Sequence, residues 1–224
     1  MRRFKTALLA SAIAACAFAA PAMAAHQFEG PGAPAEASAT GDGAQTFVFK
    51  PFRVTCETAK SATTGLATPW PAETLALQMS YGGCKAHVGK IGKSEGPAIP
   101  TKFLSAVALT YHANGYVEVG AMELAIGGLF KCHVETEAKI FPLKAEKHPT
   151  EEFNAATFTD EPVTTKSKKL PIQQQVVVHN AEIKGVHYEL SEGFCEELEM
   201  TEGKNGSYSG ALKAQVKKTN LSWK

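Results

Sequence analysis

The chain has 224 residues, of which 44% are hydrophobic and 20% charged, and its formal net charge at pH 7 is +1. This balance predicts no strong electrostatic attraction to nucleic acid or to anionic lipid. Beyond the N-terminal segment no apolar stretch reaches about 18 residues, so no transmembrane helix is expected in the rest of the chain.

Residues 1–24 have the pattern of an export signal. Three basic residues lie among the first five, an apolar stretch follows, and Ala-Met-Ala at 22–24 fits the small-x-small cleavage site. Phe4 directly follows the paired arginines, one place too early for the usual twin-arginine consensus, which favours export of an unfolded chain. The predicted location is therefore secreted or extracytoplasmic. A lipid anchor on Cys16, within a loose lipobox, is the alternative.

The mature chain is predicted to begin with a flexible leader. After cleavage the chain keeps 20 of its 23 Lys and Arg residues and all 22 Asp and Glu residues, so the net charge of the mature chain stays near neutral. Residues 25–45 are mostly Gly, Ala, Pro and Ser, and such a segment has little apolar surface with which to offset its ordering entropy. A single β-rich domain is expected over 46–224, which is long enough for a sizeable core.

Four cysteines remain after cleavage, and their spacing predicts two disulfides. None of them forms a CxxC pair, which disfavours zinc sites of the finger or ribbon kind. Three pairings are possible for Cys56, Cys84, Cys132 and Cys195. We favour Cys56–Cys84 with Cys132–Cys195, because sequential pairing closes the shorter loops. The expected role of these bonds is structural.

A hydrophobic period of two dominates the domain. In 130–140 the even positions are apolar or small and the odd ones are charged or imidazole, which is typical of a half-buried strand. Asn114-Gly115 is a two-residue hairpin signal within a three-stranded meander predicted over 103–141. Further strands are predicted at 46–56, 74–81, 172–179, 183–190, 196–202 and 207–217. A helix over 211–218 stays open as an alternative, and 144–171 has the composition of a long exposed connection.

These elements predict an all-β fold, an antiparallel β-sandwich or barrel with two disulfides. Short motifs follow one another along it: Phe-Arg-Val-Thr-Cys-Glu at 52–57, Tyr-Gly-Gly-Cys at 81–84, Phe-Lys-Cys at 130–132, Gly-Val-His-Tyr at 185–188, Cys195, and Gly-Ser-Tyr-Ser-Gly at 206–210. In this order they resemble a group of secreted bacterial β-rich proteins of uncharacterised function with a four-cysteine, two-disulfide pattern. The resemblance covers most of 50–217 and implies an extracellular β-domain. It carries no catalytic residues to transfer.

Catalytic and cofactor motifs are missing from the sequence. It contains no HExxH, GxSxG, GxxxxGK[ST] or GxGxxG pattern, so no cofactor and no catalytic residue is predicted. The only aspartates are Asp42 and Asp160, which disfavours an Asp dyad or an Asp-rich calcium loop. A secreted hydrolase with a Glu- or His-based site stays open as the alternative to a non-catalytic protein.

One strand carries candidate metal ligands. His133, Glu135 and Glu137 project from one face at i, i+2 and i+4, and with a neighbouring strand they could bind a metal ion. The competing interpretation is a solvated strand face. A second acidic stretch surrounds Cys195 and comprises Glu189, Glu192, Glu196, Glu197, Glu199 and Glu202. It lacks the alternating Asp or Asn of a calcium loop, which favours an ordinary charged surface.

Trp70 is the candidate binding residue. It lies in Thr-Pro-Trp-Pro, a rigid extended segment that could display an aromatic face to a sugar or peptide. The competing interpretation is a tryptophan that caps the core. The sequence thus predicts a secreted or cell-surface domain with a binding or structural role toward an unidentified extracellular or cell-envelope ligand, and it leaves the oligomeric state open.

Overall fold

A computed structural model of the protein describes residues 26–61, 68–88, 97–127, 132–141, 156–163, 173–193, 195, 203–217 and 219–224. The export signal, the lipidation alternative at Cys16 and the strand expected at 196–202 lie outside these residues. Every helix or strand element within them is a strand. The described part of the chain accordingly holds no helix long and apolar enough to span a membrane.

The strands follow one another closely along the chain. They are β1 (Phe28–Glu29), β2 (Ala37–Gly41), β3 (Gln45–Phe49), β4 (Phe52–Cys56), β5 (Thr58–Ser61), β6 (Thr74–Gly82), β7 (Lys85–Val88), β8 (Ala98–Phe103), β9 (Val107–His112), β10 (Val117–Val119), β11 (Met122–Ile126), β12 (Cys132–Thr136), β13 (Lys139–Phe141), β14 (Ala156–Pro162), β15 (Gln174–Gly193), β16 (Gly203–Val216) and β17 (Ser222–Trp223).

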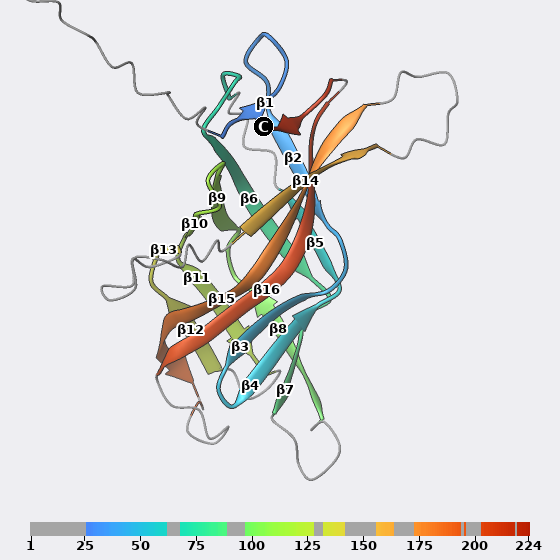
Figure 1. Ribbon diagram of the computed structural model, residues 1–224. Coiled ribbons are helices and arrows are strands. Elements are labelled where there is room, and N and C mark those ends of the chain that lie inside the picture. Colours follow the sequence, from blue (N-terminus) through green and yellow to red (C-terminus); the bar gives the residue numbers. More distant parts are fainter. Residues whose placement is uncertain are drawn as a thin grey trace, which may run out of the picture.

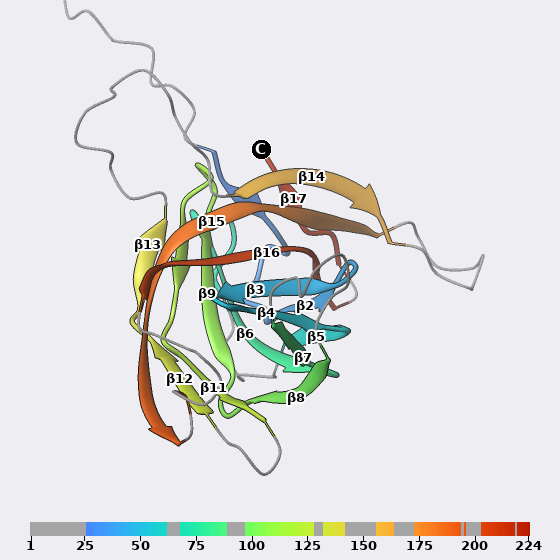
Figure 2. The same ribbon diagram turned by 90° about the horizontal axis from the view of Figure 1, so that it is seen from below.

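Eight strands close into an antiparallel β-barrel. Their order is β16-β3-β4-β7-β8-β11-β12-β15, and β15 pairs back to β16 to complete the ring. Figure 2 looks along the molecule from the barrel end and shows this ring. The predicted fold class is confirmed, with a barrel as its architecture.

The longest strands continue from the barrel into a second set of strands. One edge of β16 pairs with β3 at 207–209 and with β2 at 212–216. From β2 the sheet continues through β5, β6, β9 and β10 to β13, while β14 pairs with the first half of β15. We call these strands the upper sheet, because they lie above the barrel in Figure 1. The barrel and the upper sheet therefore share one continuous hydrogen-bonded framework.

The predicted meander forms part of that framework. His112 donates its backbone N–H to the carbonyl of Tyr116 at 2.8 Å, and Gly115 adopts the positive φ of 89° that the turn requires. The expected hairpin is thus confirmed, but its loop comprises the three residues 113–115 instead of the two residues Asn114-Gly115. Its strands β9 and β10 belong to the upper sheet, whereas β8, β11 and β12 belong to the barrel.

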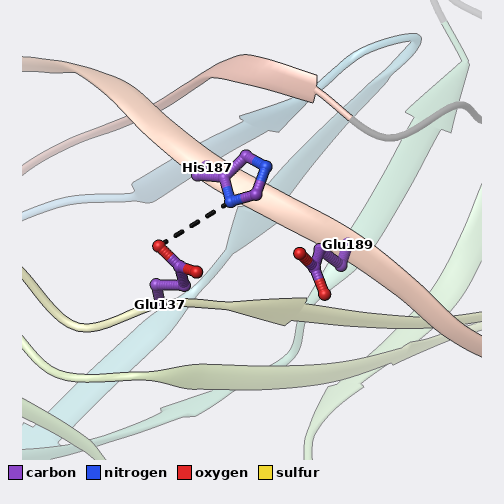
Figure 3. A group of neighbouring side chains, drawn as sticks. All are labelled: Glu137, His187 and Glu189. Carbon is purple, nitrogen blue, oxygen red and sulfur yellow. Dashed lines mark ion pairs between the residues drawn. The ribbon is translucent and has the colours of Figure 1, made fainter.

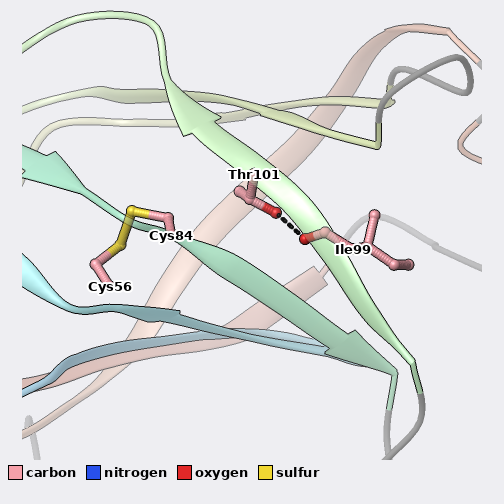
Figure 4. Close-up of a disulfide and its surroundings, with 4 residues drawn as sticks. All are labelled: Cys56, Cys84, Ile99 and Thr101. Carbon is pink, nitrogen blue, oxygen red and sulfur yellow. Dashed lines mark hydrogen bonds between the residues drawn. A yellow bond between two sulfur atoms is a disulfide. The ribbon is translucent and has the colours of Figure 1, made fainter.

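One disulfide lies where the chain crosses between the two sheets. β4 pairs with β7 in the barrel, and the strands that adjoin them, β5 and β6, pair in the upper sheet. Cys56 and Cys84 meet at this crossing with their Cα atoms 3.9 Å apart, and both are buried (Figure 4). On the neighbouring strand β8, the backbone N–H of Thr101 donates to the carbonyl of Cys84 at 3.1 Å. The bond therefore fixes the crossing point next to β8.

The other disulfide holds the far end of β15. Cys132 begins β12 and pairs in register with Gly193, the last residue of β15. Its sulfur is bonded to that of Cys195, and the two Cα atoms are 4.7 Å apart. The predicted pairing of all four cysteines is confirmed. Because disulfides persist in oxidising compartments, they indicate an extracytoplasmic environment.

The interior of the barrel is filled by its own side chains. Phe47 on β3 has its ring centroid 4.8 Å from that of Tyr208, 4.9 Å from that of Phe103 and 5.1 Å from that of Tyr81. Phe49 packs in the same way against Tyr188, at 5.4 Å. Burial of these large rings supplies much of the apolar area that stabilises the fold.

A buried amide joins this aromatic cluster to the backbone. Gln45 is fully buried, and its Oε1 accepts a hydrogen bond from the Tyr208 hydroxyl at 2.7 Å. Its Nε2 donates to the carbonyls of Gly43 and Ala211 at 3.1 and 3.0 Å. The polar atoms of this side chain are therefore paired, which offsets the cost of removing them from water.

The segment expected to be a flexible leader contributes strands to the structure. β2 pairs with β16 over five residues, from Ala37 opposite Val216 to Gly41 opposite Leu212. The edge of β16 supplies partners for the backbone N–H and C=O groups of β2, so the segment needs little apolar area of its own. Ala39, 3% exposed, is small enough to pack there.

Two other expectations differ from the structure. The strands predicted at 172–179 and 183–190 form the single strand β15, and 203–216 is a strand, which rules out the helix considered for its end. The connection expected at 144–171 contains β14 within its described residues. β14 was missed because Pro162 and the charged residues near it resemble loop composition, whereas pairing with β15 orders the backbone.

A small two-stranded sheet joins the two ends of the described chain. β1 pairs with β17, and the backbone groups of Gln27 and Lys224 exchange hydrogen bonds of 2.8 and 2.9 Å. The ring of His26 stacks on that of Trp223 at 4.8 Å, and the indole N–H of Trp223 donates to the carbonyl of Ala113. These contacts fasten both ends to the upper sheet.

Candidate functional site

The outer face of β12 and β15 gathers acidic and imidazole side chains. In β12 the buried residues Cys132, Val134 and Thr136 point inward, so His133 and Glu135 point outward. The strand pairs antiparallel with β15, with Glu135 opposite Glu189 and Thr136 opposite Tyr188. Continuing the same register places Glu137 opposite His187.

Three of these side chains approach one another closely. Glu137, His187 and Glu189 each offer a donor atom, and the three atoms lie within 4.8 Å of one another. Nδ1 of His187 lies 3.8 Å from Oε2 of Glu137. Figure 3 shows the imidazole and both carboxylates converging on the gap between the two strands. We call these three residues the His187 cluster.

The predicted metal ligands are only partly brought together. Of His133, Glu135 and Glu137, the last alone belongs to the His187 cluster. His133 and Glu137 are four residues apart, which is about 13 Å along an extended strand. One strand therefore spreads these two ligands apart, and the partner ligands come from β15.

Sequence reasoning missed His187 because its partner strand is distant in the chain. The motif Gly-Val-His-Tyr places His187 on the outward face of its strand, since Val186 and Tyr188 are buried. That alternation can be read from the sequence. The pairing of β12 with β15 cannot, because the paired residues are at least 52 positions apart, as in Thr136 and Tyr188, and no tight turn sets their register.

A row of like charges crosses the same face. Glu123 on β11 lies opposite Glu135 on β12, which in turn lies opposite Glu189 on β15. Like charges directly opposite on neighbouring strands destabilise a sheet. Two lysines lie on strands of the same sheet: Lys102, two strands from Glu135, and Lys139, whose Nζ donates to the carbonyl of Gly185 at 3.2 Å.

Trp70 is a packed residue. It is 9% exposed, and its indole N–H donates to the carbonyl of Ala35 at 3.3 Å. A Cβ added at Gly30 would come within 2.5 Å of its ring, so the backbone there lies directly on the indole face. The position matches the alternative of a core cap, and a role of Trp70 in binding stays a prediction.

Two other imidazoles have close partners on the upper sheet. Nε2 of His112 lies 2.7 Å from Oε1 of Glu118, across the hairpin of β9 and β10. Nε2 of His179 lies 3.2 Å from the hydroxyl of Thr159, across β14 and β15. Both pairs lie on the surface, and among the described residues no third side chain forms a hydrogen bond with either pair.

Comparison with known proteins adds no relative. No protein-family model, no curated protein and no solved structure matches the chain. The β-rich fold and the two disulfides agree with the group that the sequence resembles, and membership of that group stays a prediction. Function must therefore be argued from the side chains of this chain itself.

Proposed function

We propose that the protein is a secreted or cell-envelope domain with a non-catalytic binding role, in which the barrel is a scaffold and the outer surface makes the contacts. The observation that carries the proposal is the filled barrel. Barrels of eight strands either pack their interior with side chains or enclose one small ligand. Here Phe47, Phe49 and Tyr208 occupy the interior, each no more than 2% exposed.

The disulfides support the same role. Cys56–Cys84 fixes the crossing between barrel and upper sheet, and Cys132–Cys195 fixes the end of β15. A scaffold held in this way presents its outer side chains at fixed spacings, which reduces the ordering entropy that binding must overcome. Export through the signal at 1–24 would deliver the chain to the compartment where these bonds persist.

A hydrolase is the second candidate, and one observation favours it. His112 and Glu118, from neighbouring strands, lie 2.7 Å apart, which is the geometry of a general base and the group that orients it. Their side chains are 30% and 44% exposed on a single hairpin. Catalytic groups of this kind act best where water is excluded, so the pair fits a surface interaction better than an active site.

The test uses the exported protein. Its intact mass is expected to match a chain that begins at Ala25 and has four hydrogens fewer than the reduced form. A lipid-bearing chain that begins at Cys16 would instead place the domain on a membrane. The same preparation is assayed against fluorogenic ester, glycoside, phosphate and peptide substrates beside its His112→Ala variant. We expect the unmodified protein and the His112→Ala variant to show no difference in substrate turnover. Turnover by the unmodified protein that His112→Ala abolishes would establish the hydrolase.

A further inference from the structure

We propose that Glu137, His187 and Glu189 bind one divalent transition-metal ion, with Zn²⁺ as its representative, on the outer face of the barrel. This inference rests on the proposed binding function, because it names the chemical class of one ligand of that surface. It differs from the site predicted from the sequence in its ligands: two of the three come from β15.

The donor set selects the class of metal. One imidazole nitrogen and two carboxylates are ligands that Zn²⁺ uses together, with three protein ligands and a water in the fourth position. Calcium prefers six to eight oxygen ligands, and magnesium prefers an octahedron rich in water and phosphate. Imidazole also suits Co²⁺, Ni²⁺ and Cu²⁺, so these ions belong to the same class.

The geometry requires only a small adjustment. Ligand atoms about 2.0 to 2.2 Å from a tetrahedral ion lie about 3.3 to 3.6 Å from one another. The donor atoms here lie within 4.8 Å of one another, and Nδ1 of His187 is already 3.8 Å from Oε2 of Glu137. The Glu137 side chain is 72% exposed, so rotation about its own bonds can close the difference.

The backbone holds the three ligands in place. β12 and β15 are joined by a ladder that pairs Glu135 with Glu189 and Thr136 with Tyr188. The Cys132–Cys195 disulfide ties the same two strands a few residues away. His187 and Glu189 lie within β15, and Glu137 directly follows β12. Because strands position side chains more rigidly than loops do, little entropy is lost when the ion brings the ligands together.

The charge of the surrounding face is a separate observation that points to a cation. Glu123, Glu135 and Glu189 form a row across three neighbouring strands, with like charges directly opposite one another. Such pairs raise the energy of the sheet, and a bound divalent ion would offset that energy. Lys139 offsets part of this negative charge, because its Nζ donates to the carbonyl of Gly185, which lies within β15 two residues before His187.

The experiment compares two histidines of the same face. Isothermal titration of ZnCl₂ into the exported, disulfide-intact protein is expected to show one saturable site. His187→Ala and the isosteric Glu189→Gln should each weaken binding by at least about 10-fold. His133→Ala is the matched control and should change affinity by less than about twofold. Far-UV circular dichroism of each variant checks that the barrel still forms.

Three results would overturn the proposal. The first is the absence of saturable Zn²⁺ binding to the unmodified protein. The second is a loss of Zn²⁺ affinity in His133→Ala as large as that in His187→Ala. The third is displacement of Zn²⁺ by equimolar Ca²⁺, which would indicate an acidic patch without imidazole ligation. Replacing Zn²⁺ with Co²⁺ adds a spectroscopic check, because a nitrogen-ligated tetrahedral ion absorbs strongly in the visible range and Glu189→Gln should change that absorption.

The outcomes also separate this inference from the proposed function. Loss of Zn²⁺ binding with no turnover in the substrate assays would end the metal proposal and leave a binding domain for another ligand. Substrate turnover that depends on Zn²⁺ and disappears in His187→Ala would keep the site and end the non-catalytic proposal.

Discussion

Replacing Tyr208 with phenylalanine should lower the free energy of unfolding by about 2 kcal/mol. The hydroxyl of Tyr208 donates to Oε1 of Gln45 at 2.7 Å, and the two residues are 2% and 0% exposed. Phenylalanine fills nearly the same space, so no large cavity forms, but Oε1 loses its donor. A buried acceptor without a partner costs about 1–3 kcal/mol.

The assay is guanidinium denaturation of the disulfide-intact protein, followed by far-UV circular dichroism. For a chain of this size a loss of about 2 kcal/mol also lowers the midpoint of thermal unfolding by about 4–8 °C. Tyr116→Phe, at a partly exposed position of the β9–β10 hairpin, is the control. Its free energy of unfolding should stay within about 0.5 kcal/mol of that of the unmodified protein. If Tyr208→Phe lowers the free energy of unfolding no more than this control does, the buried hydrogen bonds of Gln45 do not stabilise the barrel.

Two further predictions concern pH and the disulfides. Burial raises the pKa of Tyr81 and of Tyr208, so the folded protein keeps both phenols neutral where an unfolded chain would ionise near pH 10. The free energy of unfolding should stay constant below about pH 10 and fall above it, by up to about 1.4 kcal/mol per pH unit for each tyrosine. Denaturation curves measured between neutral and alkaline pH test this, and an unchanged free energy of unfolding above about pH 10 would refute it. Replacing both cysteines of Cys132–Cys195 with alanine should cost about 4.3 kcal/mol, against about 3.6 kcal/mol for Cys56–Cys84, because the bonded residues are 63 and 28 positions apart. Equal losses in denaturant would contradict the chain-entropy explanation.

Local patterns predicted the parts of the fold that local chemistry determines. The Asn114-Gly115 turn fixes the hairpin because only a few residue types adopt its backbone angles, and the alternation in 130–140 fixes which face of β12 is buried. The cysteine pairing was also within reach, since shorter loops cost less entropy to close. None of these steps needs knowledge of distant partners.

Barrel closure and the His187 cluster depend on partners far apart in the sequence. β15 pairs with β12, β14 and β16. β14 and β16 are its neighbours in the sequence, whereas β13 and β14 lie between β12 and β15 in the chain. Glu137 could therefore be predicted as a metal ligand from its residue type and spacing. The sequence could not show that His187 and Glu189 lie next to it. The strand β2 was missed for a related reason, because its order comes from the edge of β16 rather than from its own composition.

The pairing of β1 with β17 has a consequence for how the protein is made. Gln27 bonds to Lys224, so the small sheet of β1 and β17 cannot form until residue 224 has been synthesised. A nascent chain that lacks this partner leaves Gln27 and β1 without those backbone hydrogen bonds, so this pairing forms only at the end of translation. Late completion of this pairing is compatible with the export of an unfolded chain that the sequence predicts.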